Sequence, residues 1–496
     1  MAESRILTTF EPSKVKKQHK MKRYLSLIPF VALIALISIC VSVFGTNALE
    51  GATQVSLLIA SAICVFTGYL MGRVEWDALE REMTDKIASC MPSIIILLLI
   101  GAIGGTWMVS GIVPTMIYYG VQVLRPEWFL VSSSLFCALV SVMVGSSWTT
   151  VATIGVALMG IGRALGIDEG WVAGSIITGA YFGDKLSPLS DTTVLASSVS
   201  GTPLFTHIKY MMRTTLPTFA LSLLIFAVAG LLLDVEPSQD VTFLNELRQT
   251  FAISPWLLLV PIVTGVMIAR RWPAMVVLFI AALMAAIVAA VWQPQLVAQI
   301  AAKGGASPHN TATAVYEGVM RVVYAPTQLD TGSPMIDTLV HTGGMAGMMP
   351  TVWLIICAQV FGGVVTATGV LHDLMSMMLH FVRGTASLVA STALTGIFCN
   401  IALADQYLSI ILTSSVYKDI YDDRGYESRL LSRTCEDGAT VTSVLVPWNT
   451  CGLVQSTVLG VATLTYLPYC FFNLLSPVTS VVVAATGWGI KKRHNH

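Results

Sequence analysis

Three charged residues, Asp184, Lys185 and Asp191, lie in an otherwise uncharged stretch that runs from Gly170 to Ile208. Asp405 is similarly isolated in its own apolar segment. A charge at the centre of a bilayer costs about 2.5 to 3.5 kcal/mol on insertion scales, so such residues usually line a transport pathway. Placement in a loop at the membrane interface is the alternative for Asp405 and, with less support, for Asp191.

The sequence around these charges combines a helix breaker with oxygen ligands. Pro188 lacks a backbone donor and obstructs the preceding helical turn, so a helix break is expected here, with free carbonyl groups. Carboxylate, hydroxyl and carbonyl oxygens suit a small hard cation, and sodium fits this set. The candidate ligands are Asp184, Ser187, Ser190, Asp191 and Thr192 around the break, and Ser146, Ser147 and Thr149 upstream. Asp191, Ser190 and Ser147 form the predicted sodium site.

Asp191 is the first candidate for coupling an ion to a proton. An uncompensated buried carboxylate is costly, so a proton or a cation can neutralise it, and one can displace the other. Lys185 is the predicted ion-pair partner of the adjacent Asp184, which leaves Asp191 as the exchanging group. Glu436 and Asp437 are either pathway residues or the solvated end of a charged segment.

The second half of the chain repeats the break with an amide in place of the carboxylate. Here the sequence reads Pro447-Trp448-Asn449-Thr450-Cys451, which predicts a neutral site. Three interpretations stay open for Asn449, Thr450 and Asp405. They bind a polar solute, they bind a second ion, or they bind nothing.

The amino-acid composition indicates the environment in which these charged residues lie. Of the 496 residues, 55% are hydrophobic and 11% are charged, whereas a soluble domain carries roughly 25% charged residues. Several uncharged stretches exceed the roughly 20 residues that cross a bilayer as a helix. The sequence therefore predicts an all-α polytopic membrane protein and excludes an ordinary soluble enzyme.

The net charge and the cysteine content limit the kinds of partner and site that we expect. The formal net charge is zero, so no global field would attract nucleic acid, and membrane lipid and a small solute are the expected partners. The nine cysteines are scattered and form no Cys-x-x-Cys pair. Neither a disulfide framework nor a cysteine metal site is indicated.

Ten spans are predicted, at residues 25–45, 53–72, 90–120, 171–198, 214–233, 255–269, 273–293, 349–371, 432–462 and 470–490. Two further apolar segments, 129–163 and 385–417, are interrupted midway by Gly145-Ser146-Ser147 and by Asp405-Gln406. Their arms are short for full spans. We expect re-entrant hairpins with polar tips that line a protein cavity. Two tight full spans in each segment are the alternative.

Charge bias orients the chain. The Lys-rich N-terminus and Lys491-Lys492-Arg493 belong in the cytoplasm by the positive-inside rule, and ten crossings satisfy both. A multi-pass protein of the bacterial inner membrane follows, with both termini cytoplasmic. The expected division is a basic N-terminus (1–24), a first transmembrane repeat (25–234), an extracytoplasmic linker (235–254), a second repeat (255–490) with an external loop (293–348), and a cytoplasmic tail (491–496).

The two halves resemble each other at an offset of 258 residues. This offset aligns Gly104-Gly105 with Gly362-Gly363, Ser147 with Asp405, and Asp191-Thr192 with Asn449-Thr450. Chance similarity between apolar helices is the alternative. Because the halves begin on opposite sides of the membrane, we expect an inverted repeat of two five-span halves with discontinuous helices. Such repeats characterise secondary transporters.

The stretch Gly179 to Thr193, together with Gly145-Ser146-Ser147-Trp148-Thr149, closely resembles the signature of the NhaC family of sodium/proton antiporters. The resemblance covers most of the chain. It implies the ion-transporter superfamily fold, with an inverted repeat, re-entrant hairpins, scaffold and transport domains, sodium or proton coupling, and often a homodimer. The hairpin tip departs from the pattern, because many relatives have Thr-Ser-Trp-Gly-Thr there.

Two functional hypotheses follow. The first is exchange of Na⁺ for H⁺ by alternating access, with no cofactor beyond the transported ions. The second is Na⁺- or H⁺-coupled transport of a small organic acid, such as malate or lactate, or of an amino acid, with Asn449-Thr450 and Asp405-Gln406 binding the solute. A membrane-embedded enzyme is disfavoured, because the sequence lacks the Walker A, His-Glu-x-x-His and Gly-x-Ser-x-Gly motifs. An ion channel is less favoured than alternation.

Overall fold

The computed structural model describes residues 25–44, 51–233, 240–270, 272–303, 311–327, 342–373 and 382–490. Within these ranges the chain is almost wholly helical, and its one β feature is a bridge between Thr327 and Thr342. A helix satisfies every backbone polar group within its own segment, which suits sequence this apolar. The all-α prediction is confirmed. The basic residues expected at both cytoplasmic ends lie outside the described ranges.

The described residues of the first half form ten α-helices and one π-helix. They are α2 (Ile28–Phe44), α3 (Ala52–Leu70), α4 (Trp76–Val109), α5 (Ile112–Val123), α6 (Pro126–Val144), α7 (Ser147–Thr150), the π-helix η2 (Val151–Gly155), α8 (Val156–Ala164), α9 (Glu169–Leu186), α10 (Asp191–Ser200) and α11 (Leu204–Leu232).

The second half follows with shorter pieces. They are α12 (Asp240–Thr250), η3 (Pro255–Leu258), α13 (Leu259–Ala269), α14 (Ala274–Trp292), α15 (Pro294–Lys303), α16 (Thr311–Tyr324), η4 (Ala346–Met348), α18 (Met349–Ala367), α20 (Thr385–Leu403), α21 (Gln406–Asp423), α22 (Ser428–Cys435), the π-helix η6 (Glu436–Thr440), η7 (Ser443–Leu445), α23 (Thr450–Leu459), α24 (Thr463–Tyr466), η8 (Leu467–Tyr469) and α25 (Phe471–Thr486).

Seven of the described helices are long and apolar enough to cross a membrane, or up to nine if each of two bent pairs counts as one span. Fewer helices meet this length than the ten expected spans, because the chain divides several spans. The expected span 90–120 is the long α4 followed by α5, with Gly111 in the left-handed region (φ 83°) between them. Within the expected external loop and linker, the described residues include α12, α15 and α16.

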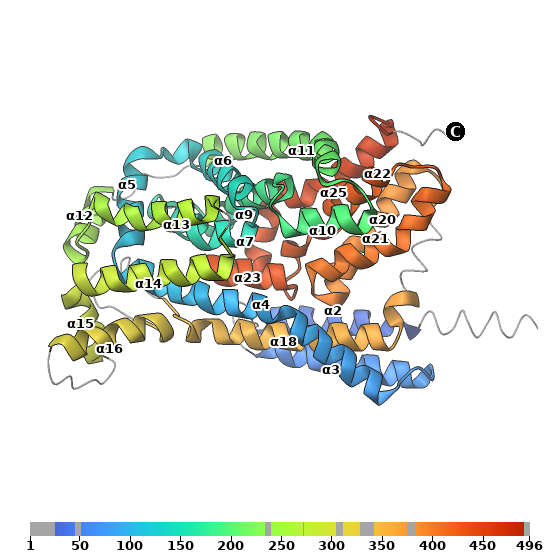
Figure 1. The fold of residues 1–496 in the computed structure, drawn as a ribbon, viewed down its shortest axis with the longest axis horizontal. Coiled ribbons are helices and arrows are strands. Elements are labelled where there is room, and N and C mark those ends of the chain that lie inside the picture. Colours follow the sequence, from blue (N-terminus) through green and yellow to red (C-terminus); the bar gives the residue numbers. More distant parts are fainter. Residues whose placement is uncertain are drawn as a thin grey trace, which may run out of the picture.

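Two groups of helices enclose the interior. Figure 1 shows α2, α3, α4 and α18 along the lower side of the view and α6, α9, α11 and α25 along the upper side. One apolar core joins α6 and α9 with the second half of α4, and another joins α2, α3 and α18 with the preceding part of α4. Trp148, at the tip between α6 and α8, packs against both cores. The middle of the molecule, where the helix breaks lie, is therefore the boundary between the two groups.

The chain reverses direction at the interruption of each predicted hairpin. In the first, Gly179 and Gly183 of α9 approach Ser134 and Ala138 of α6, so these two helices run parallel. Helix α8 runs antiparallel to them, since Gly162 approaches Val172. In the second hairpin, Ser391 and Thr395 of α20 bond to Tyr417 of α21.

Helix ends in the two halves recur with a spacing of 259 residues. The corresponding N-cap pairs are Arg125 and Gly384, Ser146 and Asp405, Asp168 and Glu427, and Ser190 and Asn449. The sequence alignment used 258, which the structure keeps where α4 and α18 end, at Val109 and Ala367, and at the left-handed glycines Gly111 and Gly369 that follow. The equivalence of Ser147 with Asp405 and of Asp191 with Asn449 is thus wrong by one residue.

Candidate ion-binding site

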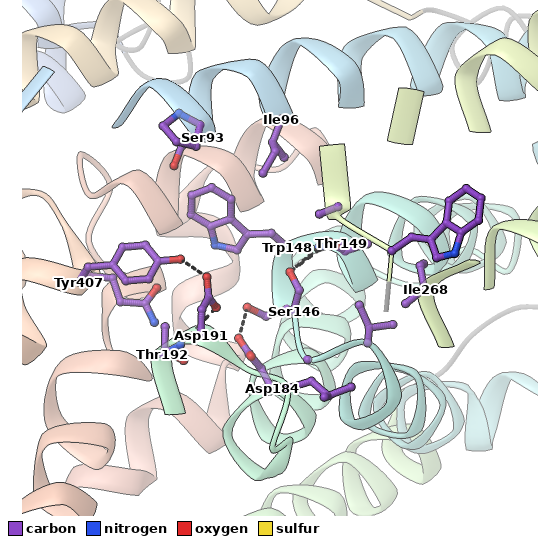
Figure 2. A pocket seen from close by; sticks show the side chains of 18 of the residues that line it. Ser93, Ile96, Ser146, Trp148, Thr149, Asp184, Asp191, Thr192, Ile268 and Tyr407 are labelled. Carbon is purple, nitrogen blue, oxygen red and sulfur yellow. Dashed lines mark hydrogen bonds between the residues drawn. The ribbon is translucent and has the colours of Figure 1, made fainter. Parts of the chain in front are cut away.

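A cavity of about 690 Å³ lies where the two hairpin tips meet the break between α9 and α10. Six predicted ligands line it, namely Ser146, Ser147, Thr149, Asp184, Asp191 and Thr192. Figure 2 shows the side chains of Asp184 and Asp191 on one side of the cavity and Ser146 and Thr149 beside them. Ser89, Pro92, Ser93 and Ile96 of α4 also line the cavity, and Figure 2 shows Ser93 and Ile96 across it from Asp184. The cavity therefore draws its lining from both groups of helices.

The break that Pro188 predicts is present. Helix α9 ends at Leu186 and α10 begins at Asp191. Ser190 is the N-cap of α10, and its Oγ accepts a hydrogen bond from the backbone N–H of Thr193 at 3.4 Å. The Ser187 Oγ accepts from the backbone N–H of Leu189 at 3.2 Å. Ser187 and Ser190 thus shape the backbone of the break and do not line the cavity.

The tip of the first hairpin packs directly on this break. Gly145 has a left-handed backbone (φ 69°), and a Cβ there would lie 2.6 Å from the Cβ of Leu189, so only glycine fits. Ser146 caps α7, and its Oγ accepts from the backbone N–H and the hydroxyl of Thr149 at 3.2 and 3.1 Å. The Ser147 hydroxyl donates to Asp184 Oδ2 at 2.8 Å. These contacts fix the tip hydroxyls beside the Asp184 carboxylate.

Two carboxylates from opposite sides of the break face the cavity. Asp184 is 5% exposed, and its Oδ1 has no hydrogen-bond partner within the described part of the chain. Asp191 is exposed to the cavity, and its Oδ2 accepts from the Tyr407 hydroxyl at 2.8 Å. Oxygen ligands are what a small hard cation prefers. The site combines them with negative charge, which suits Na⁺.

Lys185 has a different partner from the predicted one. Its Nζ donates to Asp437 Oδ1, and both side chains are fully buried. Successive side chains on an α-helix point about 100° apart, so Asp184 and Lys185 leave α9 on different sides. The predicted Lys185–Asp184 pair is wrong, and Asp184 keeps its carboxylate for the cavity.

Glu436 and Asp437 belong to the interior. Both side chains are fully buried in η6, which excludes the interpretation that they form a solvated end. The Asp437 carboxylate also accepts a hydrogen bond from the Thr214 hydroxyl of α11 at 3.4 Å. The charged segment that precedes them therefore leads into the core of the molecule.

The predicted ligands of the second half serve the backbone of the second break. Asp405 caps α21 by accepting from the backbone N–H of Leu408 at 2.9 Å. Asn449 caps α23 by accepting from the backbone N–H of Cys451 at 3.0 Å, and the backbone N–H of Thr450 donates to Ala404 O at 3.0 Å. Asp405, Asn449 and Thr450 are buried and do not line the cavity.

The predicted solute ligand Gln406 also lines the cavity, together with two aromatic residues that the sequence pattern does not indicate as ligands. Tyr407 and Gln406 come from the second tip, and Trp148 from the first. Tyr407 lies 259 residues after Trp148, the spacing that relates the helix ends of the two halves. An alignment of the two halves at an offset of 259 residues places these two aromatic residues at equivalent positions.

A sequence model of the Na⁺/H⁺ antiporter family matches residues 179–488, which begin within α9, before the break, and include the whole second hairpin. The chain belongs to the Na⁺/H⁺ antiporter family. The NhaC resemblance is confirmed by the Na⁺/H⁺ antiporter NhaC of Alkalihalophilus pseudofirmus, which is 37% identical over 89% of this chain and 91% of that protein.

Relatives with other printed names are similar over the same length. The malate-2H⁺/Na⁺-lactate antiporter of Bacillus subtilis is 34% identical over 88% of this chain and 89% of its own. The arginine/ornithine antiporter ArcD of Halobacterium salinarum is 31% identical over 93% and 92%, respectively. Each is named as an antiporter. Membership in the Na⁺/H⁺ antiporter family, with seven to nine candidate spans, describes a multi-pass membrane transporter.

Proposed function

We propose that this protein exchanges Na⁺ for H⁺ across the bacterial inner membrane by alternating access. The observation that carries the proposal is the pair of carboxylates, Asp184 and Asp191, that faces one hydroxyl-lined cavity from the two sides of a helix break. Na⁺ is held there by these carboxylates with Ser147, Thr149 and Thr192. Family membership and the NhaC relatives support the same exchange.

Competition for the same negative charge couples the two ions. Two carboxylates that face one partly desolvated cavity repel each other and are costly when both are ionised and unpaired. Na⁺ relieves that cost while it is bound, and a proton relieves it after Na⁺ leaves. The site therefore carries one cation or the other in each direction, and no ATP is needed.

The proposed architecture allows the cavity to open alternately to the two sides of the membrane. The halves related by 259 residues form an inverted repeat, the two hairpins are re-entrant, and the termini are cytoplasmic. The recurrence of N-caps and chain reversals supports the repeat. The two helix groups would then move relative to each other at the central cavity, which opens it alternately to each side. A homodimer in the lipid bilayer is proposed on the family resemblance alone.

Proteoliposomes containing the purified protein test the exchange. With no organic solute present, a Na⁺ gradient should drive a pH change in the lumen, and Asp191→Asn should abolish it while the protein still inserts. Asp168→Asn is a matched control, because Asp168 caps the start of α9 by accepting from the backbone N–H of Gly170. Exchange at the wild-type rate in Asp191→Asn would contradict the proposal.

The size of the cavity favours a second candidate, coupled transport of a small organic acid or amino acid. A volume of about 690 Å³ lies in the range of roughly 300 to 1,000 Å³ that small-molecule sites occupy. Trp148, Trp272 and Tyr407 offer apolar and polar surfaces for such a solute. If Na⁺ drives no pH change until malate, lactate or arginine is added, this candidate replaces simple exchange.

A further inference from the structure

Five charged side chains belong to the end of α9, to α22 and to η6, and the ion pair between Lys185 and Asp437 joins these elements. They are Asp184, Lys185, Arg433, Glu436 and Asp437, and each is at most 5% exposed. Asp437 joins them, because one of its oxygens accepts from Lys185 and the other lies 3.7 Å from Arg433 Nε. The guanidinium of Arg433 also lies 5.1 Å from the centre of the Tyr210 ring. One member, Asp184, lines the ion cavity as well.

Glu436 is the acidic member whose two carboxyl oxygens both lack a hydrogen-bond partner within the described part of the chain, and its side chain is fully buried. The guanidinium nitrogens of Arg433 lack one as well, and the contact of that group with Asp437 is the 3.7 Å approach. Lys185, the lysine of the cluster, donates its hydrogen bond to Asp437 and not to Glu436. An ionised carboxylate left in this state costs several kcal/mol. Glu436 is therefore stable in this arrangement as a neutral acid that holds a proton.

The charges of the cluster balance only with that proton in place. Asp184 and Asp437 supply two negative charges, and Lys185 and Arg433 supply two positive ones. His207, in the adjacent α11, is buried and shares a 2.7 Å hydrogen bond with Ser432, and it counts as neutral. A Na⁺ ion beside Asp184 adds one positive charge. Loss of the proton from Glu436 restores the balance.

The elements packed around η6 add few other charges. Helices α20 and α25 contain no Asp, Glu, Lys or Arg, and α10 contains only Asp191 at its first residue. Helix α21 has its charged residues from Lys418 onward, and α22 contributes Arg433 and Arg429. The titratable uncharged groups on these elements are Cys399, Tyr407, Tyr417, Tyr421 and Cys435. The ion pair between Lys185 and Asp437 thus links Glu436 to the ion cavity, because Asp437 follows Glu436 in η6 and Lys185 follows the cavity residue Asp184 in α9.

We propose that Glu436 is a proton-binding residue of the exchange, and that it releases its proton when Na⁺ binds beside Asp184. The step is a simple dissociation, in which the carboxylic acid loses H⁺ and becomes the carboxylate that balances the incoming cation. The π-helical turn that carries Glu436 is of a kind often found at functional sites. This inference rests on the proposed Na⁺/H⁺ exchange and adds to it a proton site outside the cavity.

Two transport modes separate the proton step from the Na⁺ step. Exchange of ²²Na⁺ for unlabelled Na⁺ requires Na⁺ binding and alternation but no net proton transfer. We expect Glu436→Gln to retain Na⁺/Na⁺ exchange and to move fewer protons per Na⁺ than the wild type, with an altered dependence on pH, because the cavity carboxylates still exchange their own proton. Glu169→Gln is the matched control, because Glu169 is exposed and pairs with Arg163 at the start of α9. It should retain both modes.

Three outcomes for the variants would overturn the proposal. The first is wild-type Na⁺/H⁺ exchange in Glu436→Gln, and the second is loss of both modes in folded Glu436→Gln. If Glu436→Gln does not fold, Glu436→Asp is measured in its place, and it should exchange Na⁺ for H⁺ with a shifted pH dependence. The third contradicting outcome is a pH dependence in Glu436→Asp that equals that of the wild type. Failure of the proposed function itself is visible separately, as absence of Na⁺-driven H⁺ movement in the wild type.

Discussion

The hydroxyl of Tyr407 donates a 2.8 Å hydrogen bond to Asp191 Oδ2, and it joins residues that lie 216 positions apart in the chain. Tyr407 belongs to the tip of the second hairpin, and Asp191 is the first residue of α10 (Figure 2). The bond therefore connects the two halves at the carboxylate to which we assign ion exchange. A movement of either half that opens the cavity would alter this contact.

Loss of that bond should favour the proton over Na⁺ at Asp191. Tyr407→Phe removes a donor that stabilises the ionised carboxylate, and a hydrogen bond to a charged group contributes about 1.5 kcal/mol or more. We expect the KM for Na⁺ to rise by about tenfold at fixed pH. The measurement is Na⁺-driven H⁺ movement in proteoliposomes. Tyr316→Phe, at an exposed position on α16, is the control, and an unchanged KM in Tyr407→Phe would exclude the role.

The Ser147 hydroxyl should contribute to Na⁺ affinity through Asp184. Ser147→Ala removes the 2.8 Å hydrogen bond to Asp184 Oδ2 and one oxygen at the tip. We expect a rise of about tenfold or more in the KM for Na⁺, with the same physical basis as a lost bond to a charged group. Ser415→Ala, at an exposed hydroxyl of α21, should leave the KM unchanged. Equal KM values in the two variants would contradict the assignment.

The buried ion pair between Lys185 and Asp437 should matter for stability. Lys185→Met leaves the Asp437 carboxylate buried with Thr214 and the distant Arg433, and breaking a buried pair in this way costs about 3 to 5 kcal/mol. We expect a lowered Tm in detergent. The double variant Lys185→Met/Asp437→Asn should regain much of the loss, because it removes the unpaired charge. If the Tm of the double variant stayed as low as that of Lys185→Met, the unpaired Asp437 carboxylate would not be the cause of the lowered stability.

Close packing of α9 on α6 should tolerate no side chain at Gly183. A Cβ there would lie 2.4 Å from Ala138 O and 2.6 Å from the Cβ of Ser141. Gly183→Ala should therefore destabilise the fold by about 1 to 3 kcal/mol, in the range of overpacked cores. Gly265→Ala is the control, since a Cβ at Gly265 meets nothing within 4 Å. A thermal-stability assay in detergent should show a lower Tm for Gly183→Ala alone.

Local signals predicted the discontinuities of the chain, and long-range contacts escaped prediction. Pro188 and the interruption at Gly145-Ser146 act on their own helices, so sequence alone located both breaks. The partner of Lys185 lies 252 residues away, and no local pattern indicates which side of α9 faces η6. Because such distant contacts leave no local pattern, the sequence suggests the adjacent Lys185 as the partner of Asp184 and does not indicate Tyr407 as a residue of the site.

The capping residues show a second limit. Ser190 and Asn449 have side chains that suit an ion and suit a helix N-terminus equally well. The structure uses both as caps, and composition could not distinguish the two uses. The one-residue error in the repeat has a similar origin. The offset of 258 matched glycines near the end of α4, whereas the hairpins and breaks that follow are related by 259.

Proton release upon Na⁺ binding tests the central claim most directly. Purified protein in a weakly buffered detergent solution, with no organic solute, is titrated with NaCl while the pH is recorded, and choline chloride controls for ionic strength. We expect saturable release of protons from the wild type and none from Asp191→Asn. Na⁺ binding without proton release, or release that begins only when an organic acid or amino acid is added, would contradict it.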